Sequence, residues 1–215
     1  MTVKTIRLLA VALAAAVFGA CQKDPSTSDL HRDYLVYTAY DTKVDFAGFQ
    51  SFFIPDRILI IGRDDKEAVY WEDDKALEII GAIVSELTSR GYTRTSEKEQ
   101  ADLGMQLSYV ERATYFVGND YPYWWWYYPY YWSPGYWGDY WAGWYYPYRV
   151  YYGYTAGSLL VEMLDLDEQD ASDKKIPVIW NSFIGGLLTS DARLDQRRLL
   201  AAVGQAFEQS PYLHR

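Results

Sequence analysis

Residues 121–154 constrain the fold more than any other part of the chain, because seven tryptophans and fourteen tyrosines fall within these 34 positions. Four prolines and four glycines are spread through the stretch, and Asp139 and Arg149 are its only charged residues. Proline fixes φ and removes a backbone donor, so this stretch cannot form a long helix or a central strand. The pattern predicts a Tyr/Trp-rich insertion over residues 118–154, which leaves the sheet as a long hairpin excursion and is separable from the fold.

The sequence leaves three interpretations of this insertion open. Its rings stack on one another and on the sheet as a lid, or they form exposed platforms for sugar faces or peptide, or they sit at a lipid interface. Under the second and third interpretations, the ligand or interface contacts are expected from the tryptophans of the insertion. These residues are Trp124, Trp125, Trp126, Trp132, Trp137, Trp141 and Trp144.

The first residues of the chain have the organisation of a secretory leader. Lys4 and Arg7 precede an uncharged apolar run over residues 8–20, which is too short to span a membrane comfortably. Two small residues end this run directly before Cys21, the only cysteine of the chain. The pattern predicts a signal peptide over residues 1–20, and with a cysteine at the cleavage point it resembles a bacterial lipobox.

Cys21 is therefore predicted to become the first mature residue and to carry a thioether-linked diacylglycerol, with a flexible polar tether over residues 21–33. Each buried methylene contributes about 0.8 kcal/mol, so two or three acyl chains anchor a protein firmly. Gln22 is not the aspartate that retains enterobacterial lipoproteins in the inner membrane. We expect a lipid-anchored outer-membrane protein, on the periplasmic face or on the cell surface.

Charge excludes one class of partner. Removal of residues 1–20 takes away 2 of the 20 basic side chains and none of the 29 acidic ones, so the mature net charge is 18 − 29 = −11. Such a chain repels phosphate backbones, and no Lys/Arg cluster interrupts it, so nucleic-acid binding is not expected. The sequence also holds no Gly-rich phosphate loop, and no cofactor is predicted.

The remaining chain, residues 34–215, has the pattern of a single α+β domain. Amphipathic helices are expected after Asp73 or Asp74, with Leu77, Ile80, Val84 and Leu87 as the apolar face, and from Asp191 to before Pro211. β-Branched, aromatic and alternating residues predict strands over residues 34–40, 49–54, 103–109, 159–166 and 178–184, while residues 57–70 are ambiguous. The predicted fold is a two-layer sandwich, a mainly antiparallel sheet covered by two helices.

Several short motifs along this domain resemble one family of lipoproteins. They are Asp45-Phe46 with Phe49-Gln50-Ser51-Phe52, Gly91-Tyr92 after a helix, Ala101-Asp102-Leu103, Leu164-Asp165, Ile179-Trp180 and the terminal helix near Ser210-Pro211. Together they are similar to the domain of unknown function 4136, which is common in Gram-negative bacteria. The resemblance implies a periplasm-side or surface lipoprotein with no assigned activity, and it supplies no catalytic residues.

Catalytic and metal-binding patterns are weak. The two histidines, His31 and His214, lie in the tether and beside the C-terminus, where neither is expected to be firmly packed. Glu111 and Asp165 are the best pair for a glycosidase, if their strands are neighbours. The run Asp165, Asp167, Asp170 and Asp173 lacks the glycine and distal glutamate of a calcium loop, and it is interpreted as a solvated loop. No catalytic residue and no metal ligand is predicted.

The function predicted from sequence is a non-enzymatic, lipid-anchored envelope module that binds or associates through the Tyr/Trp-rich insertion. The expected partners are the membrane, through Cys21, and a glycan, peptidoglycan or another envelope protein. The first alternative is a surface glycan- or peptidoglycan-binding module. A glycoside hydrolase is a remote second alternative.

Substitution of the lipidated residue tests the leader directly. Cys21→Ser should abolish acyl labelling and leave an unprocessed precursor or a mislocalised soluble form, because the acyl chains attach through the cysteine sulfur. Metabolic labelling with a fatty-acid analogue, followed by membrane fractionation, measures both effects. Normal processing and membrane retention of the variant would contradict the prediction.

Overall fold

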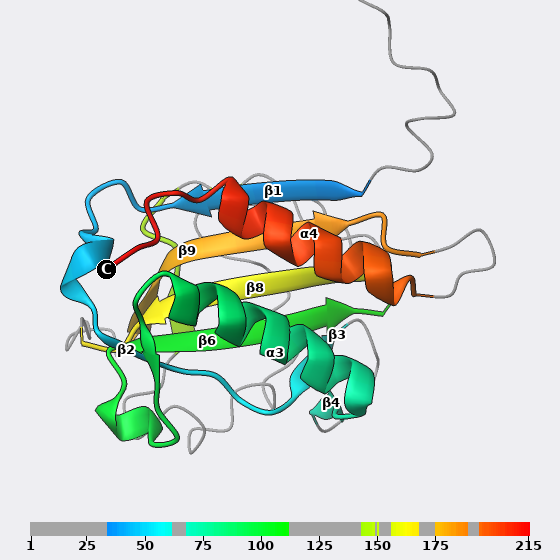
Figure 1. Ribbon diagram of the computed structural model, residues 1–215, viewed down its shortest axis with the longest axis horizontal. Helices are drawn as coiled ribbons and strands as arrows, with labels where there is room; N and C mark the ends of the chain where they lie inside the picture. Colours follow the sequence, from blue (N-terminus) through cyan, green and yellow to red (C-terminus); the bar gives the residue numbers. More distant parts are fainter. Residues whose placement is uncertain are drawn as a thin grey trace, which may run out of the picture. The chain divides into compact units, whose positions relative to one another are not determined.

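A mixed sheet carries both helices on one of its faces (Figure 1). In this computed structural model the described residues are 34–61, 68–111, 143–148, 150, 156–167, 175–188 and 194–215. They all belong to the unit Tyr34–Arg215. The predicted α+β class and the layer of helices on a sheet are confirmed within these residues.

The centre of the sheet is antiparallel, in the order β1-β9-β8-β6, and β2 and β5 continue it beyond β6. β3 pairs with β6 further along the same edge, β4 pairs with β3, and β7 pairs with β9. The pairs β2–β5, β2–β6, β3–β6 and β7–β9 are parallel, which the strand pattern of the sequence did not predict. The bounds are β1 Leu35–Tyr40, β2 Ser51–Phe53, β3 Ile58–Ile61, β4 Val69–Trp71, β5 Thr93–Arg94, β6 Leu103–Val110, β7 Gly143–Tyr145, β8 Ser158–Asp165 and β9 Lys175–Gly185.

Four helical segments are described: α3 (Asp74–Ser89), α4 (Gln196–Glu208) and the short 3-10 turns η1 (Phe46–Gly48) and η2 (Lys98–Gln100). Asp73 caps α3, because its carboxylate accepts hydrogen bonds from the backbone N–H groups of Lys75 and Ala76. The bond from Ala76 holds the pKa of Asp73 below its usual value.

The buried face of α3 differs from the predicted one. Leu77 is 45% exposed, whereas the buried residues are Ala76, Ile79, Ile80, Ile83 and Leu87. The helix carries apolar side chains around more than half of its circumference, so spacing alone did not fix which side faces the sheet.

The closing helix begins later than predicted. Asp195, rather than Asp191, caps α4 through a hydrogen bond from the backbone N–H of Arg198, and Asp191 lies outside the described residues. Leu199, Val203 and Phe207 are buried, and the helix ends before Pro211 as predicted.

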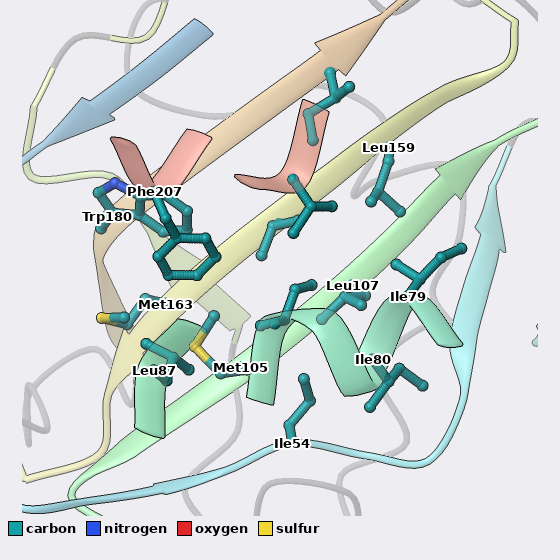
Figure 2. Close-up of a cluster of buried hydrophobic side chains, with 14 of the residues drawn as sticks. Ile54, Ile79, Ile80, Leu87, Met105, Leu107, Leu159, Met163, Trp180 and Phe207 are labelled. Carbon is teal, nitrogen blue, oxygen red and sulfur yellow. The ribbon is translucent and has the colours of Figure 1, made fainter. Parts of the chain in front are cut away.

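The main core lies between the helices and the sheet (Figure 2). Met105 and Leu107 from β6, with Met163 from β8, meet the helix residues at exposures of 0–1%. Trp180 on β9 packs against Phe207 of α4 at a ring-centroid distance of 5.5 Å, and its indole N–H donates to Ser210 Oγ at 2.9 Å. These contacts attach the C-terminal segment to the centre of the sheet.

One glycine is required by both its backbone and its surroundings. Gly157 precedes β8 with φ +75°, and its N–H donates to the carbonyl of Val110 at 2.7 Å. A Cβ at this position would lie 2.2 Å from Leu188 Cγ. Any side chain here must therefore adopt a left-handed conformation and displace a packed leucine.

Gly157→Ala should lower the free energy of unfolding by about 1–3 kcal/mol, because strain and overpacking add. Gly81→Ala is the matched control, since a Cβ at Gly81 in α3 meets no atom within 4 Å. It should raise stability by about 0.5–1 kcal/mol through helix propensity. Urea unfolding of both variants measures the two signs, and equal behaviour of the two would contradict the assignment.

Candidate functional site

A row of polar side chains crosses the sheet on the face opposite the helices. Gln106 of β6 lies directly opposite Glu162 of β8, and Glu162 lies directly opposite Asn181 of β9. Side chains alternate between faces along a strand, and Val161 and Met163 on either side of Glu162 belong to the core beneath the helices. Gln106, Glu162 and Asn181 therefore point to the other face. We call these three residues the polar row.

The polar row is buried within an apolar surround. Glu162 and Asn181 are 0% exposed, and Gln106 is 7% exposed. Their neighbours on the same face form a second apolar cluster, separate from the core beneath the helices. Its buried members are Leu59, Ile61, Val110, Tyr146, Leu160, Leu164, Ile176, Val178 and Phe183. A carboxyl in such surroundings is costly unless it is hydrogen-bonded, so its partners decide what the row does.

The partners come from the end of the Tyr/Trp-rich insertion. β7 pairs with the first residues of β9, from Lys175 to Pro177, and the chain then continues over the sheet face to Tyr148. The Tyr146 hydroxyl donates to Glu162 Oε1, and the Tyr148 hydroxyl donates to Asn181 Oδ1 at 3.0 Å. We call residues 143–148 the strap.

The two phenol rings of the strap are packed as well as hydrogen-bonded. Tyr146 is 5% exposed, and its ring meets that of Tyr148 edge-on at 5.8 Å between centroids. Burial raises the pKa of Tyr148 well above its usual range, and the nearby Glu162 carboxyl adds to the rise. Tyr148 is therefore a neutral hydrogen-bond donor at physiological pH. The remaining member of the row, Gln106, donates from Nε2 to the carbonyl of Leu107 at 2.9 Å.

The strap corrects one sequence-based expectation. The insertion over residues 118–154 was expected to be separable from the fold, but its residues 143–145 pair with β9, and the following Tyr146 belongs to a buried cluster. Trp144 lies in β7, and its side chain is outside the described part of the chain. The other predicted contact residues, Trp124, Trp125, Trp126, Trp132, Trp137 and Trp141, also lie outside the described residues, as does Cys21.

The polar row was not predicted from the sequence. A signal was present, because each of its residues interrupts a strand that is otherwise nearly apolar: Leu-Gly-Met-Gln-Leu in β6, Leu-Val-Glu-Met-Leu in β8 and Ile-Trp-Asn-Ser-Phe in β9. Such an interruption indicates a buried polar contact. The direct opposition of the three residues depends on the strand register, which the sequence alone does not give.

The pair proposed for a glycosidase is not brought together. Asp165 lies opposite Leu103 at one end of the β6–β8 ladder, and Glu111 follows Val110 at the other end. Eight residues of strand separate them, roughly 25 Å. Retaining and inverting glycosidases hold their carboxyl groups about 5–10 Å apart, so this pair cannot carry that chemistry.

The acidic run after β8 is described only in part. Asp165 Oδ1 accepts a hydrogen bond from the backbone N–H of Asp167 at 3.0 Å, and Asp170 and Asp173 lie outside the described residues. Desolvation, with the charge of Asp102, raises the pKa of Asp167. Among the residues that the structure describes, no group of three His, Cys, Asp or Glu is placed to hold a metal ion. No helix in the described ranges is long and apolar enough to cross a membrane.

Fold and site define a two-layer α+β domain in which one sheet face carries helices and the other carries a buried polar row with a tyrosine strap. The family model for a domain of unknown function, DUF4136, matches residues 36–212, and the chain belongs to this family.

A crystal structure of a DUF4136 family protein from Bacteroides thetaiotaomicron is 44% identical to this chain, with a TM-score of 0.73. The match covers 84% of this chain and 97% of that chain. A PelC dodecamer from Paraburkholderia phytofirmans is 12% identical to this chain, with a TM-score of 0.40. The match covers 85% of this chain and 99% of the PelC chain. No curated protein matches the chain.

Removal of the strap hydroxyls should destabilise the domain without changing ring packing. Tyr148→Phe leaves Asn181 Oδ1 without this donor and should cost about 1–3 kcal/mol of unfolding free energy. The folded state holds the Tyr148 proton more tightly than the unfolded chain does, so stability should fall as the pH rises above about 10. The variant should show a shallower decline in that range.

Tyr70→Phe is the matched control, because Tyr70 packs against the same cluster but has no place in the polar row. It should change stability by less than about 0.5 kcal/mol. Denaturant unfolding between pH 7 and pH 11 measures both quantities. If Tyr148→Phe behaves like Tyr70→Phe at every pH, the hydrogen bond to Asn181 contributes nothing.

Proposed function

We propose that this protein is a non-enzymatic, lipid-anchored envelope module that binds through its Tyr/Trp-rich insertion, with the α+β domain as the scaffold. The observation that supports this most directly is the attachment of the strap to the polar row. Tyr146 and Tyr148 fix the end of the insertion to the centre of the sheet, at Glu162 and Asn181. Functional residues are commonly carried on loops that a rigid scaffold positions.

The other end of the insertion also leaves from a firm part of the fold. β6 pairs with β8 over all eight of its residues up to Val110, and Glu111 N donates to the carbonyl of Ile61 at 2.9 Å. One connection therefore starts from the buried strand β6, and the other starts from β7, which pairs with β9. A binding segment attached in this way loses less conformational entropy on binding than one on a free tether.

The chemistry of the insertion favours ligands with apolar faces and hydroxyl or amide groups. Six tryptophans lie between β6 and the strap, and Asp120 and Asp139 are the two charged residues among residues 118–142. Indole and phenol rings combine a large apolar face with a polar edge, which suits sugar rings and extended peptides. A surface glycan- or peptidoglycan-binding module is the more specific form of the proposal. The carboxyl separation at Glu111 and Asp165 gives no support to the hydrolase alternative.

The proposed location is the outer membrane, with Cys21 as the lipidated residue and the domain on the periplasmic face or the cell surface. The apolar leader and its cysteine support this part of the proposal. Both locations place the insertion within reach of polymers that carry sugar rings.

Replacement of residues 118–142 by a short Gly/Ser linker tests the division between scaffold and binding segment. The strap is kept, so the variant should unfold cooperatively near the wild-type midpoint, since a change in loop length costs only about 0.6 kcal/mol per doubling. It should lose retention on purified peptidoglycan sacculi and on a glycan array. A same-length variant with the six tryptophans changed to serine is the matched control, and it should lose retention equally.

Two results would count against the proposal. If both variants bind as the wild-type protein does, the insertion is not the binding element. If the wild-type protein binds neither sacculi nor any arrayed glycan, the specific glycan form is wrong.

A third variant, with residues 118–148 replaced, should lose stability because it also removes Tyr146 and Tyr148 from the second cluster.

A further inference from the structure

β1 forms an outer edge of the sheet, because it pairs with β9 on one side and ends the strand order. Within the described ranges no strand lies on its other side. Figure 1 shows it as the blue strand at the margin of the sheet, beside α4. Its six residues pair with β9 in unbroken register from Leu35 opposite Gly185 to Tyr40 opposite Trp180. It is therefore an edge strand with regular pairing.

The direction of its backbone groups follows from one hydrogen bond. Asp41 N, which follows β1, donates to the carbonyl of Ile179 at 2.9 Å. Backbone groups alternate in direction along an antiparallel strand, so the odd-numbered residues face β9. The N–H and C=O groups of Val36, Thr38 and Tyr40 therefore face away from the sheet.

Within the described residues, this edge has none of the sequence features that usually prevent strand pairing. Proteins protect edge strands with lysine, proline, bulges or inward-pointing charges. β1 reads Leu-Val-Tyr-Thr-Ala-Tyr, with no charge and no proline, and no bulge interrupts its pairing with β9. Leu35 at its start is 60% exposed, the largest exposure among the described large apolar residues. The edge is therefore suited to the addition of another strand.

We propose that β1 pairs with β1 of a second copy of this chain, antiparallel and about a two-fold axis at Thr38. Copies of the mature chain, with a net charge of −11, repel one another, and an uncharged strand is where two such copies meet at least electrostatic cost. The two-fold relation makes the contact self-complementary, as closed dimers require.

The register about Thr38 gives favourable neighbours on both faces. Thr38 faces its own copy, and Val36 faces Tyr40 of the second copy, which are the Thr–Thr and aromatic–β-branched pairs that stabilise sheets. On the other face Tyr37 meets Ala39 of the second copy. The result is one continuous sheet, with the helices of both copies on the same face.

The contact is small, and its size sets the conditions under which it forms. Six residues of edge pairing bury less area than stable interfaces do, so the dimer needs a high local concentration. Two copies held in one membrane by acyl chains have such a concentration. This step rests on the proposed lipid anchor, which acyl labelling tests independently.

Cross-linking in cells tests the pairing on the full chain. Thr38→Cys, treated with a short bis-methanethiosulfonate reagent, should give a band of twice the chain mass on a gel, because paired Cα atoms lie about 5.5 Å apart. Lys43→Cys is the matched control. It lies five residues further along, so in this register the two copies of the residue are roughly 30 Å apart, and no band should form. The unsubstituted chain controls for Cys21.

Four results would overturn the proposal. One is a doubled band of equal strength from Thr38→Cys and Lys43→Cys, which indicates random collision, and another is no doubled band from either. The third is a cross-link from Thr38→Cys to a protein of another mass, which assigns the edge to a different partner. If the band appears only after residues 118–142 are replaced by a linker, the insertion of the same chain covers the edge, and the proposal also fails.

Discussion

The ladder between β6 and β8 determines both faces of this domain. All eight residues from Leu103 to Val110 have a partner on β8, in one register. That register places Met105 opposite Met163 beneath the helices, and it places Gln106 opposite Glu162 on the other face. A slip of one residue would turn the methionines outward and the glutamate into the helix-side core. The helical core and the polar row are therefore consequences of the same alignment.

Different interactions stabilise the two faces of the sheet. Beneath α3 and α4 the contacts are almost wholly apolar, and burial of each large side chain contributes roughly 1.5–3 kcal/mol. On the opposite face the polar row gains little net energy, because its hydrogen bonds mainly offset the cost of taking Glu162 and Asn181 out of water. What the polar row supplies is specificity. Hydroxyls at the positions of Tyr146 and Tyr148 match its acceptors, so the polar row fixes where the strap lies.

Most of the fold followed from local patterns in the sequence, and the site did not. The strands β1, β2, β6, β8 and β9 and the Asp73 cap followed from residue types, whereas β3 and β4 lie in a stretch that was ambiguous and β5 and β7 were not predicted. The buried side of α3 was not, because Leu77 and Ile79 satisfy the same helical spacing and only contact with the sheet separates them. The parallel pairs of β2 and β3 along β6 depend on chain path, which residue patterns do not encode.

The polar row shows the same limit at a longer range. Glu162 alone in an apolar strand indicates a buried partner, but that partner, Tyr146, is one of fourteen tyrosines in a repetitive stretch. The choice among them depends on β7 pairing with the start of β9, a parallel contact across about 30 residues of sequence. Composition identified the insertion as unusual. It could not show that residues 143–148 belong to the domain.

The strap is joined to the sheet by fewer backbone pairs than the central strands share with one another. β7 contributes three paired residues, whereas β8 and β6 share eight. Local opening of a protein draws on the segments with the fewest ladder bonds and buried contacts. Release of the strap breaks those three pairs and the two phenol hydrogen bonds, while the core beneath the helices keeps every contact it has. We therefore expect the strap to open before the core beneath the helices unfolds, and the polar row then faces water, where its carboxyl and amides are readily solvated. The strap can be firmly placed and still open independently, because the two faces of the sheet share the same strands but have separate cores.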